Sequence, residues 1–236
     1  MNLLAFDTST EQLTVAVQRG ARQWQHAGAG GRHSSAALIP QSLRLLDAAD
    51  LKLRDLDAIV FGRGPGSFTG LRTACSVAQG FAFGADVPVL PVDTLLAVAE
   101  QVRLQHGANQ VLALLDARMQ QVYAAPWVWR AGHGWRAAGP TIVCAPQELE
   151  LPQTETRAGS WVLAGNALAE YAGRFPAALQ GLAAHEAWPS ATALLQLAPA
   201  LLQAGAAVPA EQALPLYIRD KVAKTIAERT ASHAAS

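Results

Sequence analysis

Residues 62–72 read Gly62-Arg63-Gly64-Pro65-Gly66-Ser67-Phe68-Thr69-Gly70-Leu71-Arg72. They follow the apolar run Ala58-Ile59-Val60-Phe61 and lead into a segment with helical spacing, from residue 69 to about 83. Glycines permit a positive φ, so a loop between a strand and a helix can turn successive backbone N–H groups toward an anion. The stretch therefore predicts an α/β protein with an anion-binding loop, and Ser67 or Thr69 as the N-cap of the helix.

The loop lacks the lysine of a P-loop, because Leu71 and Arg72 follow its last glycine. The three lysines of the chain, Lys52, Lys221 and Lys224, are far away in the sequence. We therefore expect no triphosphate bound in the P-loop manner, and we expect Arg72 to tie the loop to a neighbouring carboxylate. The residues that could hold an anion or a nucleotide lie on the loop and at two strand ends: Gly64, Gly66, Ser67, Thr69, Gly70, Arg72, Asp7 and Arg118.

The composition indicates a folded protein without a strong electrostatic field for nucleic acid. The 236 residues are 51% apolar and 15% charged, and their net charge is zero, which gives a sizeable core and no global basic surface. The two cysteines, Cys75 and Cys144, provide no disulfide framework. No signal peptide and no apolar run of about 20 residues is recognisable. We therefore expect a cytoplasmic location and no membrane partner.

Two predicted helices of the first half carry faces suited to contact with another subunit. Residues 36–50, with Ser34 or Ser35 as the expected N-cap, place apolar side chains at steps of three and four. Residues 69–84 present a face of small residues. Such faces usually pack inside one subunit, and a subunit interface is the alternative interpretation. The predicted interface comprises Leu38, Ile39, Leu43, Leu46, Ala74, Cys75, Ala78, Phe81 and Ala82.

The plan of the first half is repeated in the second half. Residues 3–19 read as a hairpin whose first strand ends at Asp7, and the apolar strand 111–115 ends at Asp116 before a return strand. A strand, a glycine and a helix from residue 167 to about 175 recur around Gly165. We therefore predict two related α/β lobes, 1–105 and 106–229, with a helix over 192–202 that crosses back to the first lobe, and a disordered tail over 230–236.

Asp7 and Asp116 would face a cleft between the lobes if pseudo-symmetry relates them, as in the plan of the actin–hexokinase–Hsp70 ATPases. The alternative is that both carboxylates cap their turns by hydrogen bonds, and the first turn has no glycine to admit a phosphate. Arg118 could reach a phosphate or the carboxylate of a partner. The six histidines lack the spacing of a metal-binding pair, so we expect no metal site.

Three tryptophans, Trp127, Trp129 and Trp135, lie close in sequence to Arg130 and Arg136. This arrangement is compatible with a platform on which RNA bases stack. The interpretation that we favour is that the rings cover the outer face of a strand pair.

Three stretches together resemble one family: Phe6-Asp7-Thr8-Ser9, the run from Gly64 to Arg72, and Asp116-Ala117-Arg118-Met119 with Val122-Tyr123. The chain resembles the TsaB (YeaZ) family of accessory proteins for threonylcarbamoyladenosine synthesis in bacterial tRNA. The resemblance covers nearly the whole chain. It implies a duplicated actin-like fold of two lobes (the ASKHA, ribonuclease H-like architecture), in which the second lobe is degenerate.

The resemblance also implies a role without catalysis. Members of the family are required to form the threonylcarbamoyl group on N6 of adenosine 37 in tRNAs that read codons beginning with A. They bind and activate a TsaD-type catalytic paralogue together with a TsaE-type ATPase, form a homodimer when alone, and meet tRNA only through the complex.

The resemblance likewise bears on cofactors. Thr94 and Val98 stand where the metal-binding histidines of TsaD would lie, so the resemblance implies no cofactor of the chain's own. A nucleotide, ATP or ADP, would sit at the junction with the partner subunit.

Two other functions compete with this interpretation. A free-standing ATPase or small-molecule kinase of the same fold would use the glycine loop and the two aspartates. A peptidase would need Ser34 or Ser67 as its nucleophile. His33 precedes Ser34 and could be imagined as its base, but sequence neighbours rarely form that geometry, and a helix cap explains Ser34.

Overall fold

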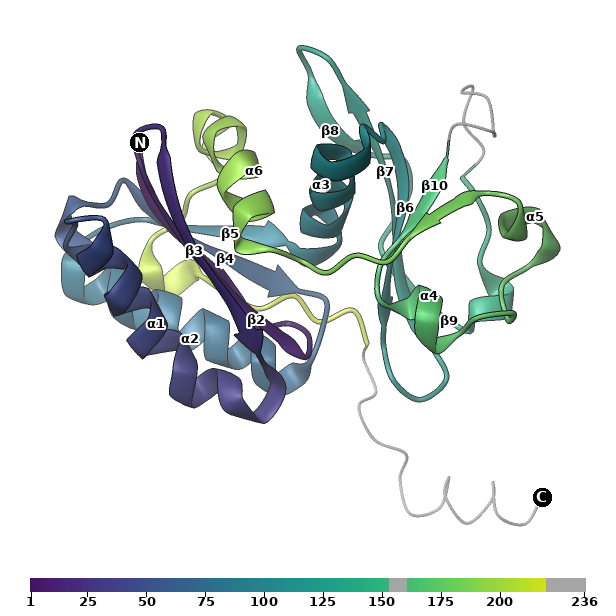
Figure 1. Cartoon of the computed structure of the whole chain (residues 1–236), viewed down its shortest axis with the longest axis horizontal. Coiled ribbons are helices and arrows are strands. Elements are labelled where there is room, and N and C mark those ends of the chain that lie inside the picture. Colours follow the sequence, from purple (N-terminus) through teal and green to yellow (C-terminus); the bar gives the residue numbers. More distant parts are fainter. Residues whose placement is uncertain (153–160, 220–236) are drawn as a thin grey trace.

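The structure, a computed structural model, describes residues 1–152 and 161–219. Two α/β lobes lie side by side, and helices α3 (Thr94–His106) and α6 (Ala191–Gln203) lie between their sheets (Figure 1). The α/β class and the two-lobe plan expected from the sequence are confirmed. The tail expected to be disordered, 230–236, lies outside the described residues.

The first lobe has a five-stranded sheet in the order β3-β2-β1-β4-β5. Strands β1 to β3 form an antiparallel meander, and β4 and β5 extend the sheet from β1 in parallel. Apolar residues run almost without interruption along β1 and β4, as strands buried on both faces require. The bounds are β1 (Asn2–Asp7), β2 (Gln12–Arg19), β3 (Arg22–Ala29), β4 (Ala58–Gly64) and β5 (Val89–Asp93).

Helices cover both faces of the first sheet. α1 (Ser34–Ala48) and α2 (Phe68–Ala85) pack on one face, against side chains such as Phe6 and Phe61. α6 packs on the opposite face, against Leu3 and Val60. The backbone N–H of Ala191 donates to Thr14 Oγ1 at 3.0 Å and fixes the start of α6 on β2. The crossing of this helix back to the first lobe is therefore confirmed.

The second lobe repeats the strand order of the first, as β8-β7-β6-β10-β11, with β9 paired to β7. β6 and β7 are antiparallel, and β10 and β11 are parallel to β6. α3 packs on one face of this sheet, and two short helices lie on the other. The bounds are β6 (Gln110–Asp116), β7 (Val122–Arg130), β8 (Gly134–Ala137), β9 (Ile142–Cys144), β10 (Val162–Ala164), β11 (Ala183–His185), α4 (Ala167–Glu170) and α5 (Ala177–Gln180).

Two helix predictions need correction. α1 begins at Ser34, so neither Ser34 nor Ser35 is its N-cap; the cap is His33, without a side-chain cap hydrogen bond. The reason is that a 3₁₀ turn, Gly31–His33, leads directly into the helix. The helix expected from residue 167 to about 175 is only α4, four residues long. Among the residues that the structure describes, the second lobe thus has no long helix equivalent to α2, whose N-cap is Ser67 as expected.

Candidate functional site in the cleft between the lobes

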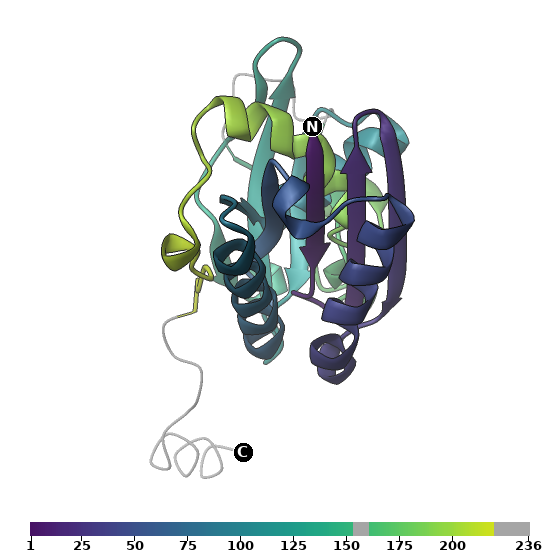
Figure 2. The same cartoon turned by 90° about the vertical axis from the view of Figure 1, so that its left-hand side faces the viewer.

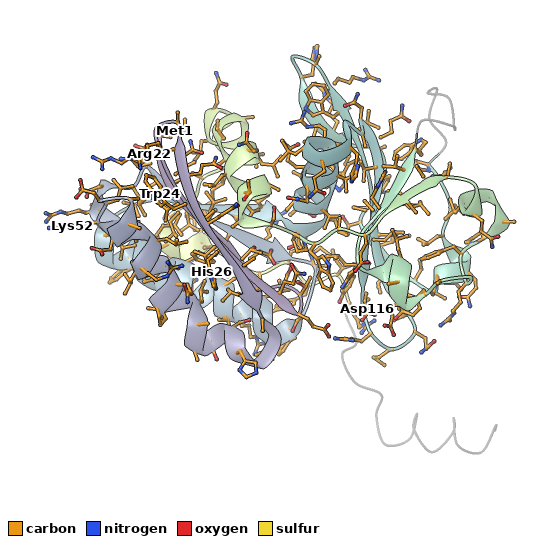
Figure 3. The ribbon with its side chains drawn as sticks, viewed as in Figure 1. Met1, Arg22, Trp24, His26, Lys52 and Asp116 are labelled. Atoms are coloured by element: carbon orange, nitrogen blue, oxygen red, sulfur yellow. The ribbon has the colours of Figure 1, made fainter. Side chains whose placement is uncertain are left out.

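A cleft of about 640 Å³ opens between the lobes at the ends of β1 and β6. Its walls come from the turn after β1, the glycine loop, the turn after β6, and residues 216–219. Figure 3 places Asp116 at this junction. Three of these four segments carry the residues that the sequence singled out for an anion or a nucleotide, so their local geometry decides what the cleft can bind.

Asp7 ends β1 but is buried beneath the cleft rather than exposed in it. Its Oδ1 accepts hydrogen bonds from Ser9 N at 2.8 Å and from Ser9 Oγ at 2.6 Å. Its Oδ2 accepts no hydrogen bond from the described residues, although the Thr94 hydroxyl acts on this carboxyl, and it lies so close to Gly62 that a Cβ there would be 1.7 Å away. Burial raises the pKa of Asp7 to about 6, against the opposing hydrogen bonds from Ser9. The expectation that Asp7 faces the cleft is wrong, and the turn-capping alternative describes its contacts.

Three backbone donors of the glycine loop are taken by the protein itself. Ser67 N donates to the carbonyl oxygen of Ser9 at 2.7 Å, and Gly64 N donates to Thr94 Oγ1 at 3.0 Å. Gly70 N donates to the capping Ser67 Oγ at 3.5 Å. An open cradle of N–H groups is therefore not formed by Gly64, Ser67 and Gly70, which corrects the geometry expected from the sequence.

The loop glycines serve contact with the first turn. A Cβ on Gly70 would lie 1.9 Å from the carbonyl oxygen of Thr8, and a Cβ on Gly66 would lie 2.5 Å from that of Ser9. Thr8 Oγ1 donates to the carbonyl oxygen of Gly70 at 2.7 Å and joins the same two segments. Only glycine permits this approach of two backbones. The turn after β1 thus packs against the glycine loop, where the sequence suggested that an anion would bind.

Arg72 forms no ion pair with a carboxylate among the described residues, so that expectation is wrong. Its Nε donates to Tyr217 Oη at 3.1 Å, and its guanidinium lies 3.8 Å from the ring centroid of Phe68. Thr69 is exposed on the first turn of α2 and does not line the cleft. Of the predicted loop contacts, Gly66 and Ser67 remain at the cleft wall.

Asp116 and Arg118 do lie in the cleft, as expected. Asp116 Oδ1 accepts from Tyr171 Oη at 2.7 Å and from Arg118 N at 2.8 Å, and its Oδ2 lies 3.1 Å from the Arg118 guanidinium. Arg118 also pairs with Glu11 from the first turn, so one arginine joins the two lobes. The nearby carboxylates, Glu11 first, raise the pKa of Arg118 and keep it charged. The carboxylates that Arg118 reaches belong to its own chain, whereas the sequence suggested a phosphate or the carboxylate of a partner.

The turn after β6 has an unusual backbone. Arg118, Met119 and Gln120 have φ values of 59°, 54° and 62°, so three successive residues other than glycine are left-handed. Each such residue costs roughly 1 kcal/mol relative to the right-handed conformation. Nothing in the sequence, which has no glycine or asparagine here, indicates this conformation.

Residues 214–219 form an irregular strap, of which residues 216–219 line the cleft, and the sequence did not predict it. Leu216 N donates to the carbonyl oxygen of Arg63 at 2.7 Å in the first lobe. Arg219 donates to Gln121 Oε1 at 2.7 Å in the second lobe. The strap therefore joins the two lobes beside the Glu11–Arg118 pair. Its only sequence signal is an aromatic and a basic residue in an otherwise unpatterned segment.

The charge of the cleft does not favour a nucleotide. Glu11, Asp116, Glu170 and Glu186 line it, against the two cations Arg118 and Arg219. A net negative lining repels the phosphates of ATP unless a bound cation neutralises it. Within residues 1–152 and 161–219, no three His, Cys, Asp or Glu side chains are grouped so that they could hold a metal ion.

The predicted partner interface divides into a buried part and an exposed part. Ile39 and Leu43 on α1 are 41% and 46% exposed, and Phe81 on α2 is half-buried. Phe83, which the sequence prediction missed, is 86% exposed on α2. We call Ile39 and Leu43 the outer helix face. The other predicted residues are buried in the core of their own lobe and offer no surface: Leu38, Leu46, Ala74, Cys75, Ala78 and Ala82.

The three tryptophans do not form an exposed stacking platform. Trp135 Nε1 donates to the buried carboxylate of Glu100 on α3 at 2.7 Å, and the Arg103 guanidinium lies 4.7 Å from the ring centroid of Trp129. Trp127 packs in the same layer. The rings therefore cover the sheet face that meets α3, which is the inner face rather than the outer one.

Comparisons with known proteins settle the family. The family model described as "TsaD: tRNA N6-adenosine threonylcarbamoyltransferase" matches residues 22–227. The chain is 32% identical to the tRNA threonylcarbamoyladenosine biosynthesis protein TsaB of Escherichia coli, over 94% of this chain and 96% of that protein. The chain belongs to the TsaB family. The TsaB of Haemophilus influenzae is 40% identical over 63% of this chain and 66% of its own length.

A solved structure agrees with this assignment to the TsaB family. YeaZ from Pseudomonas aeruginosa is 39% identical, covers 92% of this chain and 99% of its own, and superposes with a TM-score of 0.83. The resemblance inferred from the sequence and the actin-like two-lobe fold are therefore confirmed. Among the described residues, no helix of this TsaB-family chain is long and apolar enough to cross a membrane.

Proposed function

We propose that this chain is a non-catalytic subunit required for threonylcarbamoyladenosine formation at adenosine 37 of tRNA. The names of its TsaB relatives support the pathway. The observation that carries the absence of catalysis is the contact between the loop glycines and the first turn, where a Cβ on Gly70 would lie 1.9 Å from the Thr8 carbonyl oxygen. A turn sealed in this way leaves no room for a phosphate group.

The proposed partner is a TsaD-type catalytic paralogue, which docks on the outer helix face. α1 and α2 are neighbours on one side of the first lobe (Figure 1). Large apolar side chains that are exposed on one helix face are typical of a surface that a partner covers. The same face would serve a homodimer when the paralogue is absent.

A TsaE-type ATPase is proposed to join this pair, with its nucleotide at the junction between subunits rather than in the cleft of this chain. The acidic lining of the cleft and its closed glycine loop support this placement. In this proposal tRNA enters through the assembled complex.

Reconstitution of threonylcarbamoylation on tRNA tests the requirement for the chain. Purified TsaD-type and TsaE-type proteins, the threonylcarbamoyl donor and tRNA are assayed with and without this chain. We expect product only when the chain is present. Equal product without it would refute the proposal.

Binding of Mg-ATP to the isolated chain separates the proposal from a free-standing ATPase or kinase. Calorimetry should detect no tight binding, because the cleft lacks a phosphate cradle. Tight binding together with ATP turnover by the isolated chain would favour the kinase or ATPase instead.

A further inference from the structure

The β7–β8 hairpin projects from the second lobe beyond the rest of the molecule (Figures 1 and 2). Its turn, residues 131–133, is followed by Gly134, and Gly132 and Gly134 have φ values of 75° and 70°. A Cβ at either glycine would meet no atom within 4 Å. The tip is therefore open to solvent and free to approach a large partner.

The inner face of the hairpin holds it rigidly on α3. Trp129 and Trp135 are cross-strand partners and lie on this face. Trp135 is hydrogen-bonded to Glu100, and Arg103 occupies both oxygens of that carboxylate at 2.7 Å while it stacks on Trp129. The negative charge of Glu100 is thereby neutralised within the layer, and the tryptophans are unavailable for base stacking.

The opposite face of the hairpin carries two arginines. Arg130 follows Val128 at an interval of two along β7, and Arg136 pairs directly with Val128 across the strands, so both arginines lie on the face of Val128. Both are exposed. Neither side chain has an ion-pair or hydrogen-bond partner in the part of the chain that the structure describes. Neighbouring like charges of this kind are unfavourable until an anion lies between them.

The surrounding sequence leaves this positive charge uncompensated. From residue 117 to residue 147 the chain contains no Asp or Glu, and residues 187–209 contain no charged side chain. The next acids, Glu148 and Glu150, make no ion pair with either arginine. The hairpin of a chain with zero net charge thus carries two cations without an acid nearby in the sequence.

We propose that the β7–β8 hairpin binds the phosphate backbone of RNA through Arg130 and Arg136, with His133 at the tip beside them. Arginine presents a planar fork of donors that suits phosphate oxygens. The proposal rests on the proposed function, in which tRNA is the substrate of the complex, and it adds a direct contact between this chain and that tRNA.

An acidic protein surface is the competing partner, and the composition of the hairpin argues against it. Protein interfaces depend on large apolar or aromatic side chains at their centre. Between residues 127 and 141 no large apolar side chain is exposed. Small residues and free arginines without such an anchor fit a sequence-independent contact with phosphates.

The test compares two double variants in the complete complex. Arg130→Gln/Arg136→Gln removes two charges from the hairpin. Arg22→Gln/Lys52→Gln removes the same charge from side chains that lie at the far end of the first lobe (Figure 3). The affinity of each complex for tRNA is measured by fluorescence anisotropy across a series of salt concentrations, and complex assembly is checked by gel filtration.

We expect the hairpin variant to weaken tRNA binding roughly tenfold near physiological salt. The slope of log affinity against log salt should fall by about 1 to 2, since each lost phosphate contact removes about 0.7 to 0.9. The Arg22/Lys52 variant should match the wild type. Equal affinity and slope for both variants would overturn the proposal, as would loss of complex assembly in the hairpin variant, which would identify a protein partner.

The same reconstitution keeps the two proposals apart. If the wild-type chain is dispensable for threonylcarbamoylation, the proposed function fails whatever the slopes are. If the chain is required and the hairpin variant keeps the wild-type slope, only the RNA contact fails.

Discussion

The turn after β1 and the turn after β6 occupy equivalent places in two lobes with the same strand order, yet their aspartates have opposite surroundings. Asp7 is 1% exposed, and within residues 1–152 and 161–219 it forms no ion pair and leaves one oxygen without a hydrogen-bond partner. Asp116 lines the cleft, pairs with Arg118 and accepts a hydrogen bond from Tyr171. The glycine loop packs over the turn after β1, whereas the turn after β6 lines the cleft.

This difference shows that two turns at equivalent places of a duplicated plan can have different surroundings. In the first lobe, long α2 brings the glycine loop onto Thr8 and Ser9 and closes the turn. In the second lobe, short α4 leaves the turn uncovered, and carboxylates and the strap residue Arg219 surround it. The cleft that remains has an acidic lining, and the exposed Glu11–Arg118 ion pair spans it.

The largest effect should come from adding a side chain at Gly70, where the glycine loop packs against the turn after β1. Gly70→Ala places a Cβ 1.9 Å from the Thr8 carbonyl oxygen. The Cβ is fixed to one backbone segment and the oxygen belongs to another, so the clash can be relieved only if one of the two segments shifts. We expect a loss of about 4 kcal/mol or more in the free energy of unfolding, measured by urea denaturation.

Gly80→Ala on the same helix is the control for this substitution. Nothing lies within 4 Å of a Cβ at Gly80, which is exposed. This variant should be more stable than the wild type by roughly 0.5–1 kcal/mol, because alanine favours helix. Equal effects at the two glycines would contradict the sealed turn.

The second largest effect concerns Asp7 and pH. Burial raises its pKa to about 6, above its ordinary 3.8, so the folded state binds the proton before the unfolded state does. Ionised Asp7 therefore destabilises the fold above pH 6 by about 3 kcal/mol at most, and this cost disappears as the pH falls from about 6 to 4. Asp7→Asn should abolish that gain of stability on acidification.

Chemical denaturation at pH 7 and pH 4.5 measures this effect. Relative to the wild type, Asp7→Asn should be more stable at pH 7 and similar at pH 4.5. Asp47→Asn, at an exposed carboxylate on α1, should change the pH dependence little. A wild type whose Asp7-dependent stability rises with pH would contradict a raised pKa at this carboxyl.

A smaller effect is expected from the left-handed backbone of the second turn. Gln120 has a φ of 62°, which glycine adopts without strain. Gln120→Gly should leave stability unchanged or raise it by up to about 1 kcal/mol. Gln196→Gly, in the exposed interior of α6, should lower it by about 1 kcal/mol. Thermal unfolding of the pair tests the contrast, and a greater loss at Gln120 would argue against strain in the turn.

The smallest effect should come from the ion pair that spans the cleft. Glu11 and Arg118 have side chains that are 66% and 67% exposed, and water screens such pairs. Glu11→Gln should cost less than about 1 kcal/mol, and the difference should shrink in high salt. A loss of several kcal/mol would mean that this pair, rather than α3, α6 and the strap, holds the lobes together.

The sequence predicted the elements and their order because hydrophobic spacing and glycine placement are local signals. The hairpin at residues 3–19 and the N-cap Ser67 follow from such signals. The sequence also placed Asp7 and Asp116 at the ends of strands, and the repeat of this arrangement predicted the two related lobes. Each of these features can be recognised because it depends on residues that are close together in the sequence.

The details that went wrong depend on which neighbours meet in space. A face of small residues such as Ala74 and Ala78 has the same pattern whether it meets another subunit or its own sheet, and in this fold it meets the sheet. The spacing of glycines in a sequence likewise does not show whether they make room for a phosphate group or for the backbone of a neighbouring turn. The partner of Arg72 is Tyr217, 145 residues away, and no local pattern links them.

The central claim is that this chain acts through its outer helix face and not through its cleft. Reconstituted threonylcarbamoylation with two double variants, each first shown to be folded by circular dichroism, tests it directly. Ile39→Glu/Leu43→Glu should reduce the initial rate at least about tenfold, since buried charge at an interface is costly. Glu11→Gln/Arg118→Gln in the cleft should keep the rate within about twofold, because the pair is exposed. Full activity of the helix variant with loss in the cleft variant would contradict the account.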